Sequence, residues 1–176
     1  MGILMEYIPP KGKKGKRLSI VLLVIACIGL IGAAVLDIGY RLFYQLIAVL
    51  VYAFSFELLN RYHLTTFRYM VTEEDFIITK RIGKRVQTVC SLSLSTLIGI
   101  EKKPKTKEEK EAFFRRYGKP VVRYNYCQSL SPELSYCILF DFNGRLTQIV
   151  FEGNEAMAQY LNAYIRSREE SESDSI

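Results

Sequence analysis

The apolar residues of the chain form two long runs near the N-terminus and short alternating segments after them. The first run covers residues 18–36 and the second covers residues 42–59; the polar interruptions are Ser19, Gln45, Ser55 and Glu57. A helix needs roughly 20 apolar residues to cross a bilayer core, with about 17 as the lower limit. Because the segment between the runs, "DIGYR", allows only a tight reversal, residues 18–60 are predicted to form a transmembrane helical hairpin.

Basic residues concentrate at the two outer ends of this hairpin. The reversal carries Arg41, which Asp37 offsets, whereas the outer ends carry Lys11, Lys13, Lys14, Lys16, Arg17, Arg61 and Arg68. The positive-inside rule places such ends in the cytoplasm. The pattern therefore predicts a multi-pass protein of the plasma (inner) membrane with both termini cytoplasmic, in which residues 1–17 are a basic cytoplasmic segment.

A cleaved signal peptide is the alternative interpretation of the first run. The start of the chain is basic, and "GAA" at residues 32–34 is a conceivable cleavage site. However, the apolar run is longer than the apolar region of a typical signal peptide, and a second run follows at once. These two features favour the hairpin.

Past residue 60 the pattern changes to short segments rich in β-branched and aromatic residues, each bounded by turn residues. Such spacing is typical of antiparallel strands. Seven strands are predicted, at residues 67–72, 76–81, 84–92, 95–103, 120–130, 133–142 and 145–152. With the helices described below, the fold class is α+β, mostly β, and residues 61–168 are expected to form one cytoplasmic domain.

The strongest turn signal is "DFNGRL", in which Asn143 and Gly144 stand between two apolar runs. An Asn-Gly pair in this setting predicts a two-residue type I′ hairpin, and the turn fixes the strand register. In that register the residues of one face, predicted to point into the core, are Tyr136, Ile138, Phe140, Thr147, Ile149 and Phe151.

A first helix is predicted between the fourth and fifth strands of this set. Thr106 and Glu109 have the spacing of a capping box, Phe113 and Tyr117 lie one turn apart, and Gly118 ends the segment. We expect this helix to be an insert in the strand pattern.

A second helix is predicted to close the domain. Asn154 is its expected N-cap, and a single apolar stripe follows at helical spacing: Met157, Tyr160, Leu161, Tyr164 and Ile165. Such a stripe must be buried against something, and a curled sheet is the nearest apolar partner. Residues 169–176, "EESESDSI", have no apolar content to fold with and are predicted to be an acidic disordered tail.

Strands followed by a closing amphipathic helix resemble a family, the bacterial pleckstrin-homology-like domains found beside transmembrane hairpins. The residues that carry the resemblance are "FRYMVTEEDFIITKRIGKR", "SLSLSTLIGIEK" and "LSYCILFDFNGRLTQIVFEGNEAMAQYLNAYI". It implies a seven-stranded antiparallel barrel or sandwich capped by the C-terminal helix. Eukaryotic relatives usually carry a tryptophan in the closing helix, and this chain has none.

Residue types that carry catalysis or bind metals show no productive spacing. The chain has one histidine, His63, and four cysteines without a CxxC pair. A nucleophile–base pair and a Gly-rich phosphate loop are also missing from the sequence. We therefore expect no enzyme activity, no cofactor and no metal site. The cysteines are expected to be buried apolar groups, with a redox pair of Cys127 and Cys137 as the alternative.

The clearest candidate contact is the segment "TKRIGKRV" at residues 79–86, in which Lys80, Arg81, Lys84 and Arg85 surround one glycine. An antiparallel meander that starts at the membrane returns to it at this turn, so the four cations are predicted to contact the anionic inner leaflet. The alternatives are a solvated turn with no role and a pocket for a specific lipid headgroup.

Within the hairpin, Gly29 and Ala33 form a small-xxx-small face suited to close helix packing. Packing against the second span is one interpretation, and the seam of a homo-oligomer is the other. Glu57 precedes Arg61 by four residues and is predicted to pair with it, while a role in ion transport is the alternative.

The sequence thus favours a membrane-anchored binding or scaffolding module. Its expected partners are the anionic bilayer surface and an unidentified protein or second copy of the chain. A chain tethered to a membrane rarely meets nucleic acid, so nucleic acid is not expected. The alternative function is an accessory subunit of a membrane transporter or envelope enzyme complex.

Overall fold

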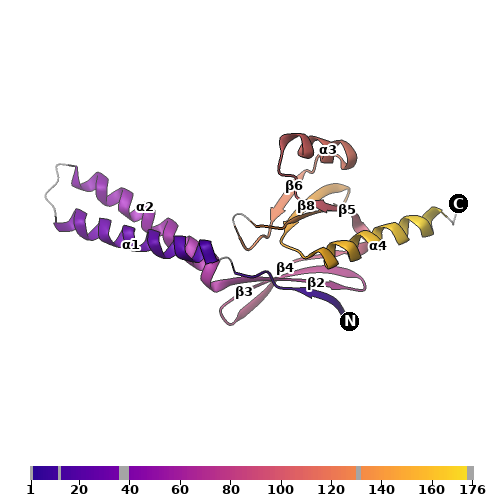
Figure 1. Cartoon of the computed structure of the whole chain (residues 1–176), viewed down its shortest axis with the longest axis horizontal. Coiled ribbons are helices and arrows are strands. Elements are labelled where there is room, and N and C mark those ends of the chain that lie inside the picture. The colour runs from indigo at the N-terminus through magenta and orange to yellow at the C-terminus, as the bar shows by residue number, and fades with distance from the viewer. Residues whose placement is uncertain (1, 12, 36–39, 130–131, 174–176) are drawn as a thin grey trace.

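The computed structural model describes residues 2–11, 13–35, 40–129 and 132–173. The fold is α+β: two apolar N-terminal helices, two β-sheets and a C-terminal helix. The helix pair projects from one end of the sheets (Figure 1).

The helix pair comprises α1 (Lys13–Val35) and α2 (Arg41–Leu59), and the π-helix η1 (Asn60–Leu64) continues α2 toward the sheets. Two segments, Gly15–Ala33 and Leu42–Leu64, are long and apolar enough to cross a membrane. The helices agree with the two runs predicted from the sequence. Residues 36–39 of the expected reversal lie outside the described part of the chain.

The first sheet has the strand order β1-β2-β3-β4 and is antiparallel throughout. Its strands are β1 (Ile3–Tyr7), β2 (Thr65–Thr72), β3 (Asp75–Ile82) and β4 (Arg85–Ser93). The sequence interpretation missed β1, since it treated residues 1–17 only as a basic segment. A lone five-residue strand is stable only when it pairs, and its partner β2 lies about sixty residues further along the chain.

The second sheet has the order β5-β7-β8-β6. Its strands are β5 (Leu97–Lys102), β6 (Val122–Asn125), β7 (Tyr136–Phe142) and β8 (Arg145–Phe151), and a short 3₁₀ turn, η2 (Leu94–Thr96), connects the two sheets. The fold is therefore not a single seven-stranded barrel. The expectation of purely antiparallel strands is also wrong, because β6 pairs with β8 in parallel.

The predicted Asn-Gly hairpin is confirmed. Asn143 and Gly144 both have positive φ, as a type I′ turn requires. The resulting register pairs Tyr136 with Phe151 and Ile138 with Ile149, and both pairs are buried.

Two helices complete the fold. The helix α3 (Lys107–Tyr117) has the predicted capping box between Thr106 and Glu109, and Phe113 packs with Cys137 and Leu139 on the outer face of the second sheet. The helix α4 (Glu155–Ser173) begins at the predicted cap, where Asn154 Oδ1 accepts a hydrogen bond from the Met157 amide at 2.8 Å.

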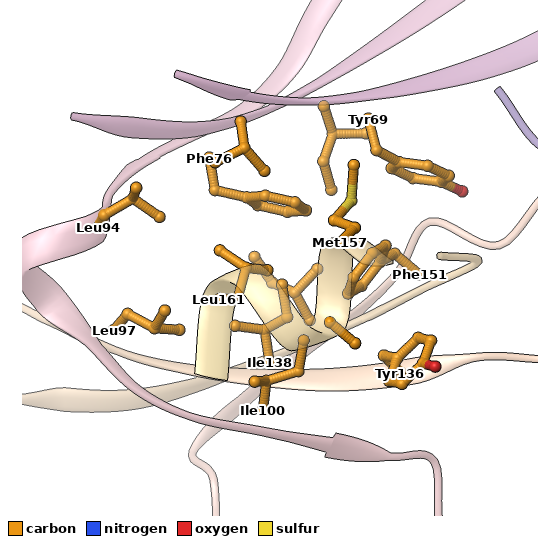
Figure 2. Packing of buried hydrophobic residues seen from close by; sticks show 14 of the residues in the cluster. Tyr69, Phe76, Leu94, Leu97, Ile100, Tyr136, Ile138, Phe151, Met157 and Leu161 are labelled. Atoms are coloured by element: carbon orange, nitrogen blue, oxygen red, sulfur yellow. The ribbon is translucent and has the colours of Figure 1, made fainter. Parts of the chain in front are cut away.

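The main core lies between the two sheets and α4. Figure 2 shows Met157 and Leu161 of α4 directed toward Tyr69, Phe76 and Phe151, and the edge-to-face ring contacts Tyr69–Phe151 and Phe76–Phe151 have centroid distances of 5.3 and 5.2 Å. The predicted apolar stripe of the closing helix is thus confirmed. The helix continues to Ser173, so the prediction of disorder from residue 169 is wrong for residues 169–173. A helix already nucleated by its docked turns extends into polar residues at little cost.

Candidate functional site

The basic turn between β3 and β4 lies at the end of the sheet where α2 arrives. Thr65, the first residue of β2, pairs with Ile82, the last residue of β3. The Gly83 amide donates a hydrogen bond to the carbonyl oxygen of Leu64, at 3.4 Å. Because strands β2 and β3 are antiparallel, their acidic turn Glu73-Glu74 lies at the opposite end of the sheet. The structure therefore places the basic turn next to the helix pair and the acidic turn far from it.

The four predicted cations lie on both faces of this turn. Ile82 pairs with Arg85 on one face and Arg81 pairs with Val86 on the other, while Lys84 occupies the turn itself. Arg81 Nε donates a hydrogen bond to the Gly83 carbonyl at 3.0 Å, which stiffens the turn. Among the described residues no ion pair involves these cations, and all but Lys80, which is half-buried, are exposed. Their charge is therefore available to a partner.

The small residues of the hairpin face the other helix. A Cβ placed on Gly29 would lie 3.7 Å from the Cβ of Ala48 in α2, and Ala26 and Ala33 are buried. A Cβ on Gly15 would lie 2.4 Å from the Tyr62 ring. Gly29 itself is exposed, and it lines with Ala33 a groove of about 340 Å³ between the helices, so contacts within the hairpin cover this face only in part.

A polar junction that the sequence did not reveal joins the helix pair to the sheets. The buried side chain of Gln128 donates hydrogen bonds to the carbonyl oxygens of Arg61 and Thr65, at 3.0 and 2.9 Å. Its Oε1 accepts a hydrogen bond from the Phe67 amide at 3.0 Å. One side chain therefore holds η1, the start of β2 and the loop after β6 together.

Arg61 also belongs to this junction. Its guanidinium donates a hydrogen bond to the Cys127 carbonyl at 3.1 Å. The predicted pair with Glu57 is wrong within the described residues: Glu57 is exposed on α2, and no ion pair joins it to Arg61. The tertiary contact overrides the local spacing because the loop after β6 offers Arg61 a partly buried acceptor.

A buried carboxylate completes the junction. Glu152 follows β8 and accepts a hydrogen bond from the Ser129 amide. Burial raises the pKa of the Glu152 carboxyl above its usual value, although the amide donors and the positive charge of Arg61 oppose this shift. The nearby Tyr69 hydroxyl donates to the Tyr126 carbonyl at 2.8 Å.

A groove between β5, α3 and α4 has a volume of about 780 Å³. Two pairs of its charged groups interact: Lys102 lies 3.6 Å from Glu155, and Arg116 pairs with Glu101. In the described residues no three His, Cys, Asp or Glu side chains gather as a metal site would need. Lys103 and Lys105 also line the groove and form no ion pair among the described residues.

The cysteines outside the hairpin are poorly reactive as thiols. Burial raises the pKa of Cys127 to about 12 and that of Cys90 to about 11, and it also raises the pKa of Cys137. All four cysteines are free. His63 lies in η1, where its carbonyl oxygen accepts a hydrogen bond from Lys11 Nζ at 2.8 Å.

No model of a known protein family matches the chain, and no curated protein is significantly similar to it.

Proposed function

We propose that this chain is an integral protein of the inner membrane that presents a cytoplasmic, pleckstrin-homology-like binding module at the anionic membrane surface. The observation that carries the proposal is the basic turn at residues 79–86, held beside Leu64 at the end of a candidate membrane span. Four unpaired cations at that level would each add on the order of 1 kcal/mol of attraction to an anionic leaflet.

The pairing of β1 with β2 supports a topology with both ends of the hairpin on one side of the membrane. The strand β1 precedes α1, β2 follows α2, and their pairing includes Tyr7 with Tyr69. The basic residues before α1 and after α2 favour the cytoplasm as that side. A reporter fused after Ile176 should be active only as a cytoplasmic reporter.

The two-sheet core closed by α4 supports the relation to pleckstrin-homology-like domains. Such a domain acts by binding, and the groups described above provide no nucleophile with a neighbouring base. We therefore propose a role as a scaffold without catalysis.

The experiment that tests the surface contact uses the full chain, because deletion of residues 1–60 would remove β1 from the first sheet. The protein is reconstituted into vesicles of neutral or anionic phospholipid and treated with a water-soluble amine-acylating reagent. Acylation of each lysine is then measured by peptide mass spectrometry. Lys107, exposed at the start of α3, is the internal control for Lys84.

We expect acylation of Lys84 to fall on going from neutral to anionic vesicles and to recover at high salt, with Lys107 unchanged. Salt reverses the effect because it screens exposed charges. Equal acylation of Lys84 in neutral and anionic vesicles would show that the turn is a solvated loop without contact with anionic lipid. As a second control, substitution of Lys80, Arg81 and Arg85 by Glu should abolish the protection of Lys84 from acylation in anionic vesicles.

One observation favours the second candidate, an accessory subunit of a membrane complex. Glu57 is exposed on a face of α2 that would meet lipid, and an ionisable side chain in that position generally has a functional partner. Solubilisation of native membranes and capture of the full chain tests this idea. Recovery of a multi-span protein that is lost with Glu57→Gln and kept with Gln45→Ala favours the subunit; recovery of soluble proteins only favours the scaffold.

A further inference from the structure

The basic turn also carries apolar side chains that the core does not use. Ile82 and Val86 are 46% and 65% exposed, and Leu64, whose carbonyl accepts the hydrogen bond from Gly83, is 46% exposed. These three residues, named here the apolar tip, come from η1, the end of β3 and the start of β4. Arg81, Lys84 and Arg85 lie between and around them.

The length of α2 sets the depth of this tip. Its 19 residues, at about 1.5 Å each, span roughly 28 Å, which matches a hydrocarbon core of about 30 Å. The following helix η1 passes through the headgroup layer, which is roughly 5–8 Å thick on each side. Leu64 ends η1, so the turn bonded to it reaches the same layer.

We infer that the apolar tip is inserted in the interfacial layer of an anionic phospholipid bilayer, with Ile82 and Val86 below the phosphates and the surrounding cations among them. This inference rests on the proposed function and deepens it, because the domain then contacts the acyl boundary as well as surface charge. Peripheral helices insert their apolar faces about 5–10 Å in the same way, with basic residues beside them.

Two features favour lipid over a protein partner at the tip. The candidate membrane span that exposes Phe54 and Phe56 ends at Leu64, which is itself part of the tip. The tip is also the only end of the first sheet, within the described residues, that combines exposed large apolar side chains with cations on a turn; the opposite turn carries Glu73 and Glu74. Net positive charge around apolar groups is complementary to anionic lipid.

The chain contains no tryptophan, so a single introduced tryptophan reports one position. Val86→Trp and Ile82→Trp place it in the apolar tip, and Glu73→Trp places it in the exposed turn at the opposite end of the sheet. Each full-length variant is reconstituted in anionic vesicles made from phosphatidylglycerol and phosphatidylcholine, with or without bromine on the acyl chains. Emission wavelength and quenching by the brominated lipid are measured.

We expect blue-shifted emission and quenching by brominated lipid at residues 82 and 86, and water-like, unquenched emission at residue 73. Water-like, unquenched emission at both tip positions in vesicles that still float with the protein would overturn the inference and leave the membrane anchor standing. Failure of all three variants to float with the vesicles would instead overturn the proposed function. Quenching at residue 73 equal to that at residue 86 would also overturn the inference, because the domain would then lie on its side.

Discussion

The helix pair and the two sheets with α4, named here the sandwich, contain similar apolar side chains but expose them to very different extents. Ile31 and Leu42 of the helix pair are 65% and 83% exposed, whereas Ile138 and Leu161 of the sandwich are fully buried. Soluble monomers rarely expose contiguous apolar patches above a few hundred Å². The sandwich buries its apolar side chains within the protein. The helix pair leaves many of its apolar side chains exposed, so it needs an apolar environment outside the chain. The difference teaches that the surface of the sandwich is suited to water, whereas that of the helix pair is suited to an apolar surrounding such as lipid.

The regions also differ in what fills their interiors. The sandwich interdigitates large rings such as Phe76 and Phe151 with α4, so its stability comes from removing apolar area from water. The helix pair brings Gly29 next to Ala48 and relies on close backbone approach, as expected where lipid is as apolar as the side chains. Substitutions in the two interiors should therefore destabilise the protein for different reasons.

The largest expected effect is the loss of the sandwich core in Leu161→Asp. A charge at this fully buried position in α4 should cost more than about 3 kcal/mol in free energy of unfolding. Urea titration of the full chain in mild detergent, followed by tyrosine fluorescence, measures this change. The matched control is Gln159→Asp on the exposed side of the same helix. If Leu161→Asp unfolds at the same urea concentration as the control, α4 is not docked as described.

A smaller effect is expected in the helix pair from Gly29→Leu. A Cβ at Gly29 is already in van der Waals contact with Ala48, so the further atoms of leucine should overpack this contact and weaken the association of α1 with α2 by about 1–3 kcal/mol. Gly32→Leu is the control, because a Cβ there has no atom within 4 Å. Thermal melting of the helical circular dichroism signal in detergent compares the two. Equal destabilisation by both variants would show that close packing at Gly29 is not what holds the helices together.

The smallest effect concerns the junction between the two regions and depends on pH. The pKa of Glu152 is raised in the folded protein, so the folded state binds a proton more tightly than the unfolded chain. The stability from this group is full below the ordinary pKa and is lost as pH rises toward the raised one, with a slope of at most about 1.4 kcal/mol per pH unit.

Glu152→Gln should remove this slope, so the advantage of the variant over the parent should grow as pH rises from about 4.5, the ordinary value for glutamate. Urea titrations over a pH series measure it. Glu111→Gln, at an exposed position of α3, controls for the loss of a surface carboxylate. If the free energies of unfolding of the parent and of Glu152→Gln change with pH in parallel, burial of this carboxyl does not limit stability.

Local patterns were enough to predict several elements. The continuous apolar runs predicted both helices of the pair, because length and hydropathy are local properties. The Asn143-Gly144 turn predicted the β7–β8 register, because a two-residue loop leaves the strands one way to pair. The capping residues Thr106 and Asn154 predicted where α3 and α4 begin, since a cap bonds amides only two or three residues away.

What only the tertiary structure decided are the contacts between distant segments. The sequence did not show that β1 pairs with β2, or that β6 runs parallel to β8, because strand partners and directions leave no trace in a short apolar segment. Gln128 and Glu152 are polar residues in loops, and only folding buries them around Arg61. The sequence by itself determined most of the elements, though not β1, and the position of the basic turn along the chain. The fold decided that this turn lies against Leu64, because a hydrogen bond across nineteen residues depends on the pairing of two whole strands.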